Sequence, residues 1–188
     1  MTEQLLLKAL VFAAERHKDQ TRKGKSNIPY INHPIEVAHV LSSFGETEYD
    51  LLIAAFLHDV IEDTVKNDIE KENLKNDIRK QFGSNVLEIV LEVSDNKSLS
   101  YKERKKLQVI NTPNLSDSAK KIKIADKICN ILDIKNRPPE KWSNQRKLEY
   151  LKWAKSVVNG AVGLNKKLDQ YFFDTYNKVH TYLKNNKP

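Results

Sequence analysis

The sequence is poor in cysteine, in glycine and in long apolar runs. Cys129 is its one cysteine, so no disulfide forms within the chain and a reducing compartment, the cytoplasm, is expected. Five glycines among 188 residues are too few for the frequent turns of a β-sandwich or barrel. No segment approaches the roughly 18 apolar residues of a membrane span, and the polar start of the chain is unlike a signal peptide. A soluble protein without a membrane partner is therefore expected.

The charge is unbalanced toward the basic side. Lys and Arg total 32 against 25 Asp and Glu, which gives a formal net charge of +7. Such an excess suits either an anionic ligand or a lysine-rich surface kept for solubility, and composition alone favours the second. A nucleic-acid interface would need a basic stripe with base-reading or aromatic residues on one element. The lysines are instead spread among acids, so no nucleic-acid partner is expected.

Helical periodicity runs through almost the whole chain, without internal repeats or low-complexity linkers. It predicts an all-α bundle of about eight to ten helices, forming one domain over residues 1–188 with its core at about 5–183. The second helix is expected from Pro34 to Gly45. Thr47 is expected to cap a third helix that continues through Ile61, and Ser84 to cap a short apolar helix.

The segment AAFLHDVIEDT places four titratable residues at the end of an otherwise apolar helix. His58 and Glu62 are four residues apart and share a helix face, as do Asp59 and Asp63. Burying such groups without partners is costly, and a metal ion satisfies an adjacent His and Asp together. A His-Asp pair alone is a weak signal, because the histidine could instead bond within the core while the acids face water.

Two further segments supply similar side chains. His33, in PYINHP, directly precedes an expected helix, and Asp126, in KIADKICN, interrupts an apolar face with Asn130 one turn later. The simpler interpretations are that His33 caps the helix and that Asp126 is a buried acid paired with a lysine. Together the segments offer two imidazoles and two carboxylates, a set that suits a divalent ion such as Mn²⁺, Fe²⁺, Co²⁺ or Zn²⁺. Its members are His33, His58, Asp59 and Asp126.

The order H…HD…D resembles that of the HD-domain phosphohydrolase superfamily. Further segments sharpen the likeness to the hydrolase domain of RelA/SpoT-type alarmone enzymes, and most of all to the stand-alone small alarmone hydrolases of the metazoan SpoT homologue type. These segments are Arg22-Lys23 with PYINHP, then LHDVIEDT, VSDNK, ADKICN and the Trp142–Tyr150 pattern. The resemblance extends from about Leu5 to the last helix, and no synthetase domain is expected.

The resemblance implies hydrolysis of ppGpp and pppGpp at the 3′ position, giving GDP or GTP and pyrophosphate. It implies Mn²⁺ as the usual cofactor, with other divalent ions possible, held by the four residues just named. The ion would lower the pKa of a bound water and polarise the phosphoryl group. Glu62 and Asp63 would orient or deprotonate the attacking water, and the sequence leaves open which of them is the base.

The resemblance also implies substrate contacts from basic and polar residues. These are Arg22, Lys23, Tyr30, Lys97, Arg104, Lys127, Asn130, Arg146 and Tyr150. For Lys127 a phosphate contact and a surface charge are equally good interpretations, and Trp142 is expected to pack rather than bind. The other members of the run Lys102–Lys106 are expected to be solvated. Cys129 stands where relatives often carry a larger residue, which leaves the base preference open.

Other functions remain compatible with the same residues. One is hydrolysis of another phosphorylated nucleotide, such as an adenosine alarmone or the 2′-phosphate of NADPH. Another is an alarmone-binding regulator without catalysis, against which the complete ligand set argues. The sequence leaves the oligomeric state and the native metal open.

Overall fold

The computed structural model describes residues 2–24 and 27–186, and over these residues the chain is helical. An isolated antiparallel bridge between Thr21 and Pro29 is the one extended pairing in that part of the chain. The helices are α1 (Thr2–Arg16), α2 (Asn32–Ser43), α3 (Tyr49–Leu57), α4 (Val60–Asp63), α5 (Asp68–Phe82), α6 (Ser84–Val93), α7 (Tyr101–Asn111), the 3-10 helix η1 (Thr112–Asn114), α8 (Asp117–Asn136), α9 (Asn144–Asn159) and α10 (Lys166–Asn185). The predicted all-α class is confirmed.

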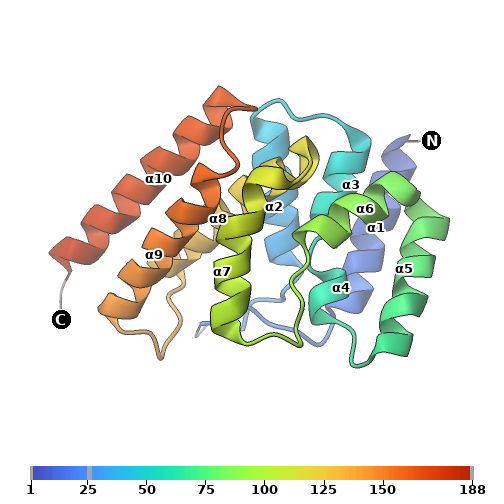
Figure 1. Ribbon diagram of the computed structural model, residues 1–188, viewed down its shortest axis with the longest axis horizontal. Helices are drawn as coiled ribbons and strands as arrows, with labels where there is room; N and C mark the ends of the chain where they lie inside the picture. The colour runs from blue at the N-terminus through green and yellow to red at the C-terminus, as the bar shows by residue number, and fades with distance from the viewer. Residues whose placement is uncertain (1, 25–26, 187–188) are drawn as a thin grey trace.

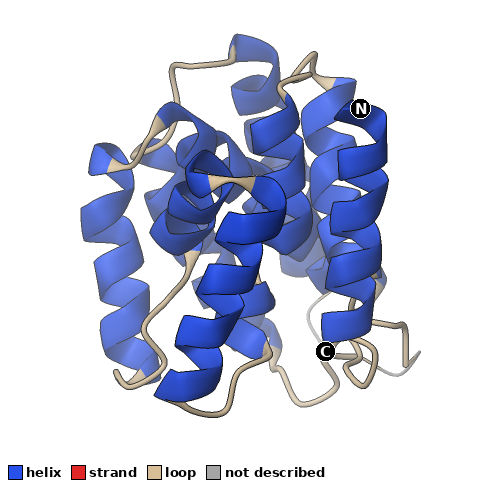
Figure 2. Cartoon of the chain, turned by 90° about the vertical axis from the view of Figure 1, so that its right-hand side faces the viewer, coloured by secondary structure: helices blue, strands red, loops and turns tan. Residues whose placement is uncertain are grey.

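Helix α8 is the central element of the bundle. It packs against α2, α3, α6, α9 and α10, and its apolar residues are buried along most of its length. Figure 1 shows α9 and α10 on one side of it and α1, α5 and α6 on the other. The connections that follow α1, α4, α6 and α8 all lie at the lower end of the bundle (Figures 1 and 2). That end carries the polar side chains described below.

The expected third helix is broken where the chemistry is concentrated. Helix α3 ends at Leu57 and α4 begins only at Val60, because Asp59 has φ −100° and ψ −6° and leaves the regular helical path. The prediction of one continuous helix through Ile61 was therefore wrong. The break turns His58 and Asp59 away from the spacing of a straight helix.

Several predicted helix ends shift by a few residues. Glu48, in an extended conformation, precedes α3 in place of the expected Thr47. Gly83 has φ 96° and occupies the cap position of α6, so Ser84 is its first helical residue. Helix α2 runs from Asn32 to Ser43, which makes Pro34 its third residue rather than its first. Helix α9 is capped by Ser143, whose hydroxyl accepts a hydrogen bond from the Arg146 N–H.

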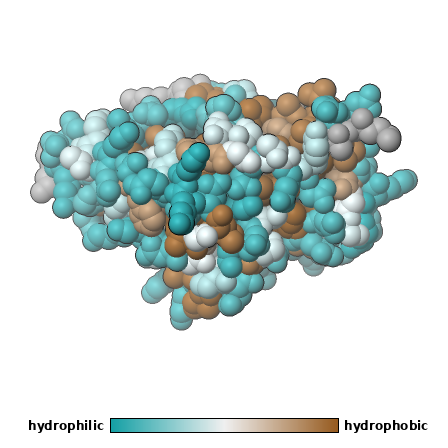
Figure 3. Space-filling model, turned by 90° about the horizontal axis from the view of Figure 1, so that it is seen from above, coloured by the Kyte–Doolittle hydropathy of each residue, from teal (hydrophilic) through white to brown (hydrophobic). Residues whose placement is uncertain are grey.

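The face of the molecule seen from above is mainly hydrophilic (Figure 3). Figure 3 shows hydrophobic atoms in separate groups on the upper face. Leu7 and Val11 of α1 and Ile69 of α5 are among the exposed large apolar residues. Within residues 2–24 and 27–186, no helix has the length and apolar character needed to cross a bilayer.

We predict that Gly160→Ala destabilises the fold by about 1–3 kcal/mol. A Cβ at Gly160 would lie 2.9 Å from Cδ of Pro113, which belongs to the rigid ring of a residue in η1. Either α9 or η1 must therefore shift. Urea unfolding measures the change. The control is Ser156→Ala on the exposed side of α9, expected to stay within about 0.5 kcal/mol. Equal stability of both variants would contradict the close approach.

Candidate metal centre and active site

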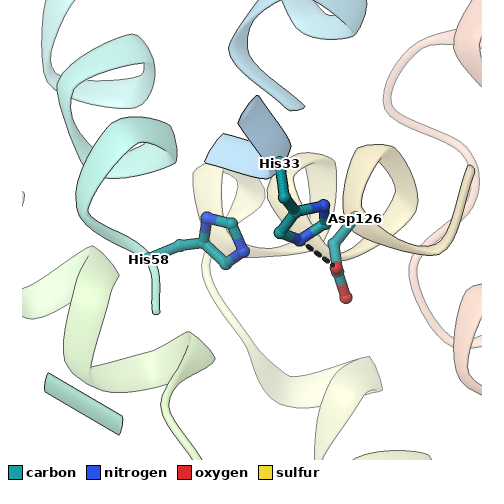
Figure 4. Close-up of side chains that lie close together, drawn as sticks. All are labelled: His33, His58 and Asp126. Carbon is teal, nitrogen blue, oxygen red and sulfur yellow. Dashed lines mark ion pairs between the residues drawn. The ribbon is translucent and has the colours of Figure 1, made fainter. Parts of the chain in front are cut away.

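His33 and Asp126 face one another from two helices. His33 is the second residue of α2 and is 1% exposed. Its Nε2 lies 3.1 Å from Oδ1 of Asp126 on α8. Figure 4 shows this pair with the His58 imidazole beside it. The start of α2 and the middle of α8 are thus held together at a buried, charged point.

His58 presents its Nε2 atom to the same point. Its Nδ1 lies 2.8 Å from the Ala55 carbonyl oxygen, which can only accept, so the proton belongs on Nδ1. Nε2 is then left to bind either a second proton or a metal ion. That atom is buried and has no hydrogen bond among the described residues, although Oδ2 of Asp59 is 3.0 Å away. A ring nitrogen this close to a carboxylate oxygen needs a positive charge between them, which either a proton or a metal ion can supply.

The residues present fit a divalent metal ion. His33, His58 and Asp126 each offer one ligand atom, and these atoms lie within 4.8 Å of one another. Oδ2 of Asp59 is 3.7 Å from Nε2 of His33 and so lies beside the same three. Although burial lowers it, the pKa of His58 is raised to about 9 by Asp59 and Asp126. The same negative potential would attract a cation.

Neighbouring donors fix the Asp126 carboxylate. Lys127 Nζ lies 2.7 Å from Oδ2, and Asn130 Nδ2 donates to Oδ1 at 2.5 Å. Burial raises the pKa of Asp126, but Lys127 and His33 outweigh it and hold that pKa well below its usual value. The carboxylate is therefore ionised and oriented before any ligand arrives.

Tyr30 links two of the acids. Its hydroxyl lies 2.7 Å from Oδ2 of Asp59, to which it donates, and 3.2 Å from Oδ2 of Asp63. The Tyr30 ring packs against His17, with the centroids 4.8 Å apart. His17 Nδ1 contacts Gln20 Oε1, and Gln20 Nε2 donates to the Asp63 carbonyl. Residues in the connection between α1 and α2 thus fix the positions of Asp59 and Asp63.

The sequence assigned no role to His17 and did not single out Gln20. Neither belongs to a segment that carries the family pattern, and their contribution depends on contacts across the fold. The spacing of His17 and Gln20, three apart near the end of a helix, could have suggested only that they interact with each other.

Glu62 lies next to the centre in a partly desolvated position. Its Oε2 accepts the Asp95 N–H at 2.9 Å, and its Oε1 is 3.5 Å from Lys97 Nζ and 3.6 Å from Arg104 Nη1. Burial, more than the neighbouring acids, raises the pKa of Glu62, while the Asp95 N–H opposes the rise. Asp63 is bonded to Lys97 Nζ at 2.5 Å. The two acids therefore have different surroundings.

A cavity and a larger groove lie side by side and share Tyr30, Asp63 and Asn130 in their walls. The cavity has a volume of about 160 Å³ and is lined by the four candidate ligands together with Glu62, Asp63 and others. The groove, about 380 Å³, is lined by several of the expected substrate residues: Arg22, Lys23, Tyr30, Lys97, Asn130 and Tyr150. Trp142 also lines it while packing on Tyr150, with the ring centroids 5.4 Å apart.

The remaining expected substrate residues have varied surroundings. Arg104 lines a third pocket, of about 290 Å³, beside Glu62 and Asp63. The Arg146 guanidinium lies 4.7 Å from the Trp142 ring centroid, in a further pocket that shares Trp142 with the groove. Lys127 is buried rather than a surface charge. The Arg22 guanidinium donates to Asp133, with its Nη2 2.6 Å from Oδ2, and to Asn130.

Two expectations about other residues need revision. Lys105 was expected to be solvated, but its Nζ lies 4.3 Å from the Trp153 ring centroid and 5.2 Å from those of Tyr101 and Tyr150. The rings attract the ammonium group and hold it at the wall of the pocket. Cys129 is buried in the core and lines neither the cavity nor the groove.

Comparison with known proteins agrees with this geometry. The HD domain family model matches residues 9–152, and the chain belongs to the HD-domain family. It is similar to the guanosine-3′,5′-bis(diphosphate) 3′-pyrophosphohydrolase MESH1 of Xenopus tropicalis, with 46% identity covering 90% of this chain and 94% of that protein. The human MESH1 is 43% identical, covering 88% and 89% respectively.

A solved structure gives the same result. It is described as a metazoan ortholog of SpoT that hydrolyzes ppGpp and plays a role in starvation responses. The TM-score is 0.85 at 38% identity, covering 93% of this chain and 94% of that one. The resemblance to the small alarmone hydrolases seen in the sequence is thereby confirmed.

We predict that Tyr30→Phe weakens divalent-ion binding by about 10- to 100-fold. The change removes the hydroxyl that donates to Asp59 and leaves the ring in place on His17. Titration calorimetry of metal-stripped protein with Mn²⁺ measures the affinity.

The matched control is Tyr182→Phe on α10, because Tyr182 is 41% exposed and lines neither the cavity nor the groove. Unchanged metal affinity in Tyr30→Phe together with a raised KM would instead indicate that the hydroxyl contacts substrate.

Proposed function

We propose that this protein is a metal-dependent (p)ppGpp 3′-pyrophosphohydrolase that converts ppGpp and pppGpp into GDP and GTP with release of pyrophosphate. The observation that carries the proposal is the buried group of two imidazoles and two carboxylates beside Glu62 and Asp63. This group opens directly onto a groove with basic and aromatic walls. The identity to MESH1 proteins supports the same reaction.

We take the ion to be Mn²⁺, with other divalent ions able to use the same ligands. His33, His58, Asp59 and Asp126 would hold it, and Lys127 and Asn130 keep Asp126 in place. When bound, the ion would activate water and polarise the phosphoryl group. The rest of the chemistry falls to side chains of the chain itself.

Glu62 is the better candidate for the base. Its carboxylate lies in a partly buried position that raises its pKa toward the working pH, which favours proton transfer. Asp63 is tied to Lys97 at 2.5 Å and to the Tyr30 hydroxyl at 3.2 Å. Those bonds suit a fixed carboxylate that orients Lys97 and the groove wall rather than one that accepts a proton.

The groove provides the groups that a doubly phosphorylated nucleoside needs. Lys23 and Lys97 supply charge for phosphates, and Arg104 supplies it in the adjoining pocket. Asn130 and Tyr150 offer a polar group and a ring for the nucleoside, with Trp142 and Arg146 at the outer end. Arg22 orients Asn130 through its hydrogen bond at 2.9 Å. We infer that residues 1–188 act as one hydrolase domain, in the cytoplasm.

We predict that metal-stripped protein hydrolyses ppGpp only after Mn²⁺ is restored, releasing GDP and pyrophosphate. Ion-exchange chromatography of the nucleotides measures the reaction, and Asp126→Asn serves as the control that lacks a metal ligand. Absence of turnover with the metal shown to be bound would contradict the proposal. An adenosine alarmone and NADPH, tested in parallel, show whether the same site prefers another nucleotide.

We predict that Glu62→Gln lowers kcat by about 100- to 10,000-fold and leaves metal affinity unchanged. In the wild-type protein the rate falls as Glu62 is protonated, at a higher pH than for an ordinary glutamate because burial raises its pKa. That acidic limb of the pH–rate profile should be absent in the variant.

Glu88→Gln, on the exposed side of α6, is the control and should match the wild type. Full activity of Glu62→Gln would show that another group accepts the proton.

A further inference from the structure

The orientation of Glu62 depends on a loop without regular secondary structure. Oε2 of Glu62 accepts the Asp95 N–H at 2.9 Å, and Asp95 lies between α6 and α7 in residues 94–100. The two cations on the other oxygen, Lys97 and Arg104, are at 3.5 and 3.6 Å. Those distances exceed that of a good hydrogen bond. The backbone N–H is therefore the directional contact that fixes the carboxylate.

Gln108 connects that loop to a helix. It belongs to α7, and its Nε2 donates to Oδ2 of Asp95 at 2.7 Å. An ionised carboxylate can only accept, so the amide must present its nitrogen to Asp95. The bond spans thirteen residues of sequence and joins the loop to the first long element after it.

The Gln108 side chain has no other hydrogen bond within the described residues. Its Oε1 is buried and lacks a partner, and Gln108 lines both the cavity of the metal centre and the pocket beside Glu62. A buried amide with a free oxygen costs folding free energy. An apolar side chain of the same length would avoid that cost, so the amide serves the contact with Asp95.

We propose that Gln108 is a positioning residue for the reaction: it anchors Asp95, and the Asp95 N–H then orients the Glu62 carboxylate toward the water it activates. The inference rests on the proposed function in giving Glu62 the role of base. Gln108 itself touches neither the candidate ligands nor Glu62 through any hydrogen bond that the structure contains. Its effect passes through Asp95.

The test is Gln108→Met, which keeps the length of the side chain and removes the amide. We expect kcat for ppGpp to fall about 10- to 100-fold, as for a misplaced catalytic group. KM and the Mn²⁺ affinity from calorimetry should stay unchanged. Gln170→Met is the matched control, because Gln170 also donates to a carboxylate, that of Asp174 at 2.9 Å, but on the exposed surface of α10.

A double-mutant cycle separates positioning from a general structural effect. In a Glu62→Gln background, Gln108→Met should have little further effect on kcat, because the group that it positions is already lost. An equal fold-loss in both backgrounds would overturn the proposal. So would a raised KM or a weakened Mn²⁺ affinity with kcat unchanged, which would place Gln108 at the substrate or the metal.

A readout that needs no turnover distinguishes this inference from the proposed function. The pKa of the Glu62 carboxyl can be followed by carbon NMR of labelled, metal-free protein, with Glu62→Gln assigning the signal. Losing a hydrogen bond to the charged form should raise that pKa in Gln108→Met. An unchanged pKa would overturn the inference even in an active enzyme. Wild-type protein that does not hydrolyse ppGpp would overturn only the function.

Discussion

The buried carboxylates of Asp59 and Asp126 are the constraint on which the rest of the site depends. Two negative charges in a desolvated position are tolerable only if cations and donors surround them. The structure meets this requirement with His33, Lys127 and Asn130 around one carboxylate and with the Tyr30 hydroxyl on the other. These partners come from two separate stretches of the chain, residues 30–33 and 127–130. The packing of these elements at the lower end of the bundle therefore also assembles the site.

Much of the fold follows from local sequence. The apolar spacing and the capping residues place most helices to within a few residues, because both act over one or two turns. The break at Asp59 does not follow from them. The segment from Leu51 to Ile61 is apolar at helical spacing apart from His58 and Asp59, and the helix breaks at these two residues, which face the charged centre.

The candidate site likewise contains residues that the sequence could predict and residues that it could not. His58, Asp59 and Asp126 could be picked out because titratable residues interrupt or end apolar helix faces, and His33 because it directly precedes an expected helix. Residues that act on them could not. Tyr30 lies in a recognised segment, but the sequence does not show that its hydroxyl contacts Asp63 and donates to Asp59, which is 29 residues away. Gln108 carries no sequence signal, since an exposed helix tolerates glutamine anywhere.

The ion pairs of the basic residues show why the net charge says little about the ligand. Arg22 forms an ion pair with Asp133, and Arg137 forms ion pairs with Asp133 and Glu36. Lys127 is committed to Asp126. Lys23, by contrast, has no ion pair among the described residues and lines the groove.

A phosphate entering the groove therefore competes with carboxylates for some cations and not for others. Lys23 can meet it without losing a partner, whereas Lys97 would share its three N–H donors between the phosphate, Asp63 and Glu62. An anion at Lys97 would thus compete with Glu62 for this cation. The Glu62 carboxylate would keep the Asp95 N–H as its fixed contact. The loop from residue 94 to residue 100 therefore supplies both a fixed donor, the Asp95 N–H, and a cation that an anion can compete for, Lys97, to the same carboxylate.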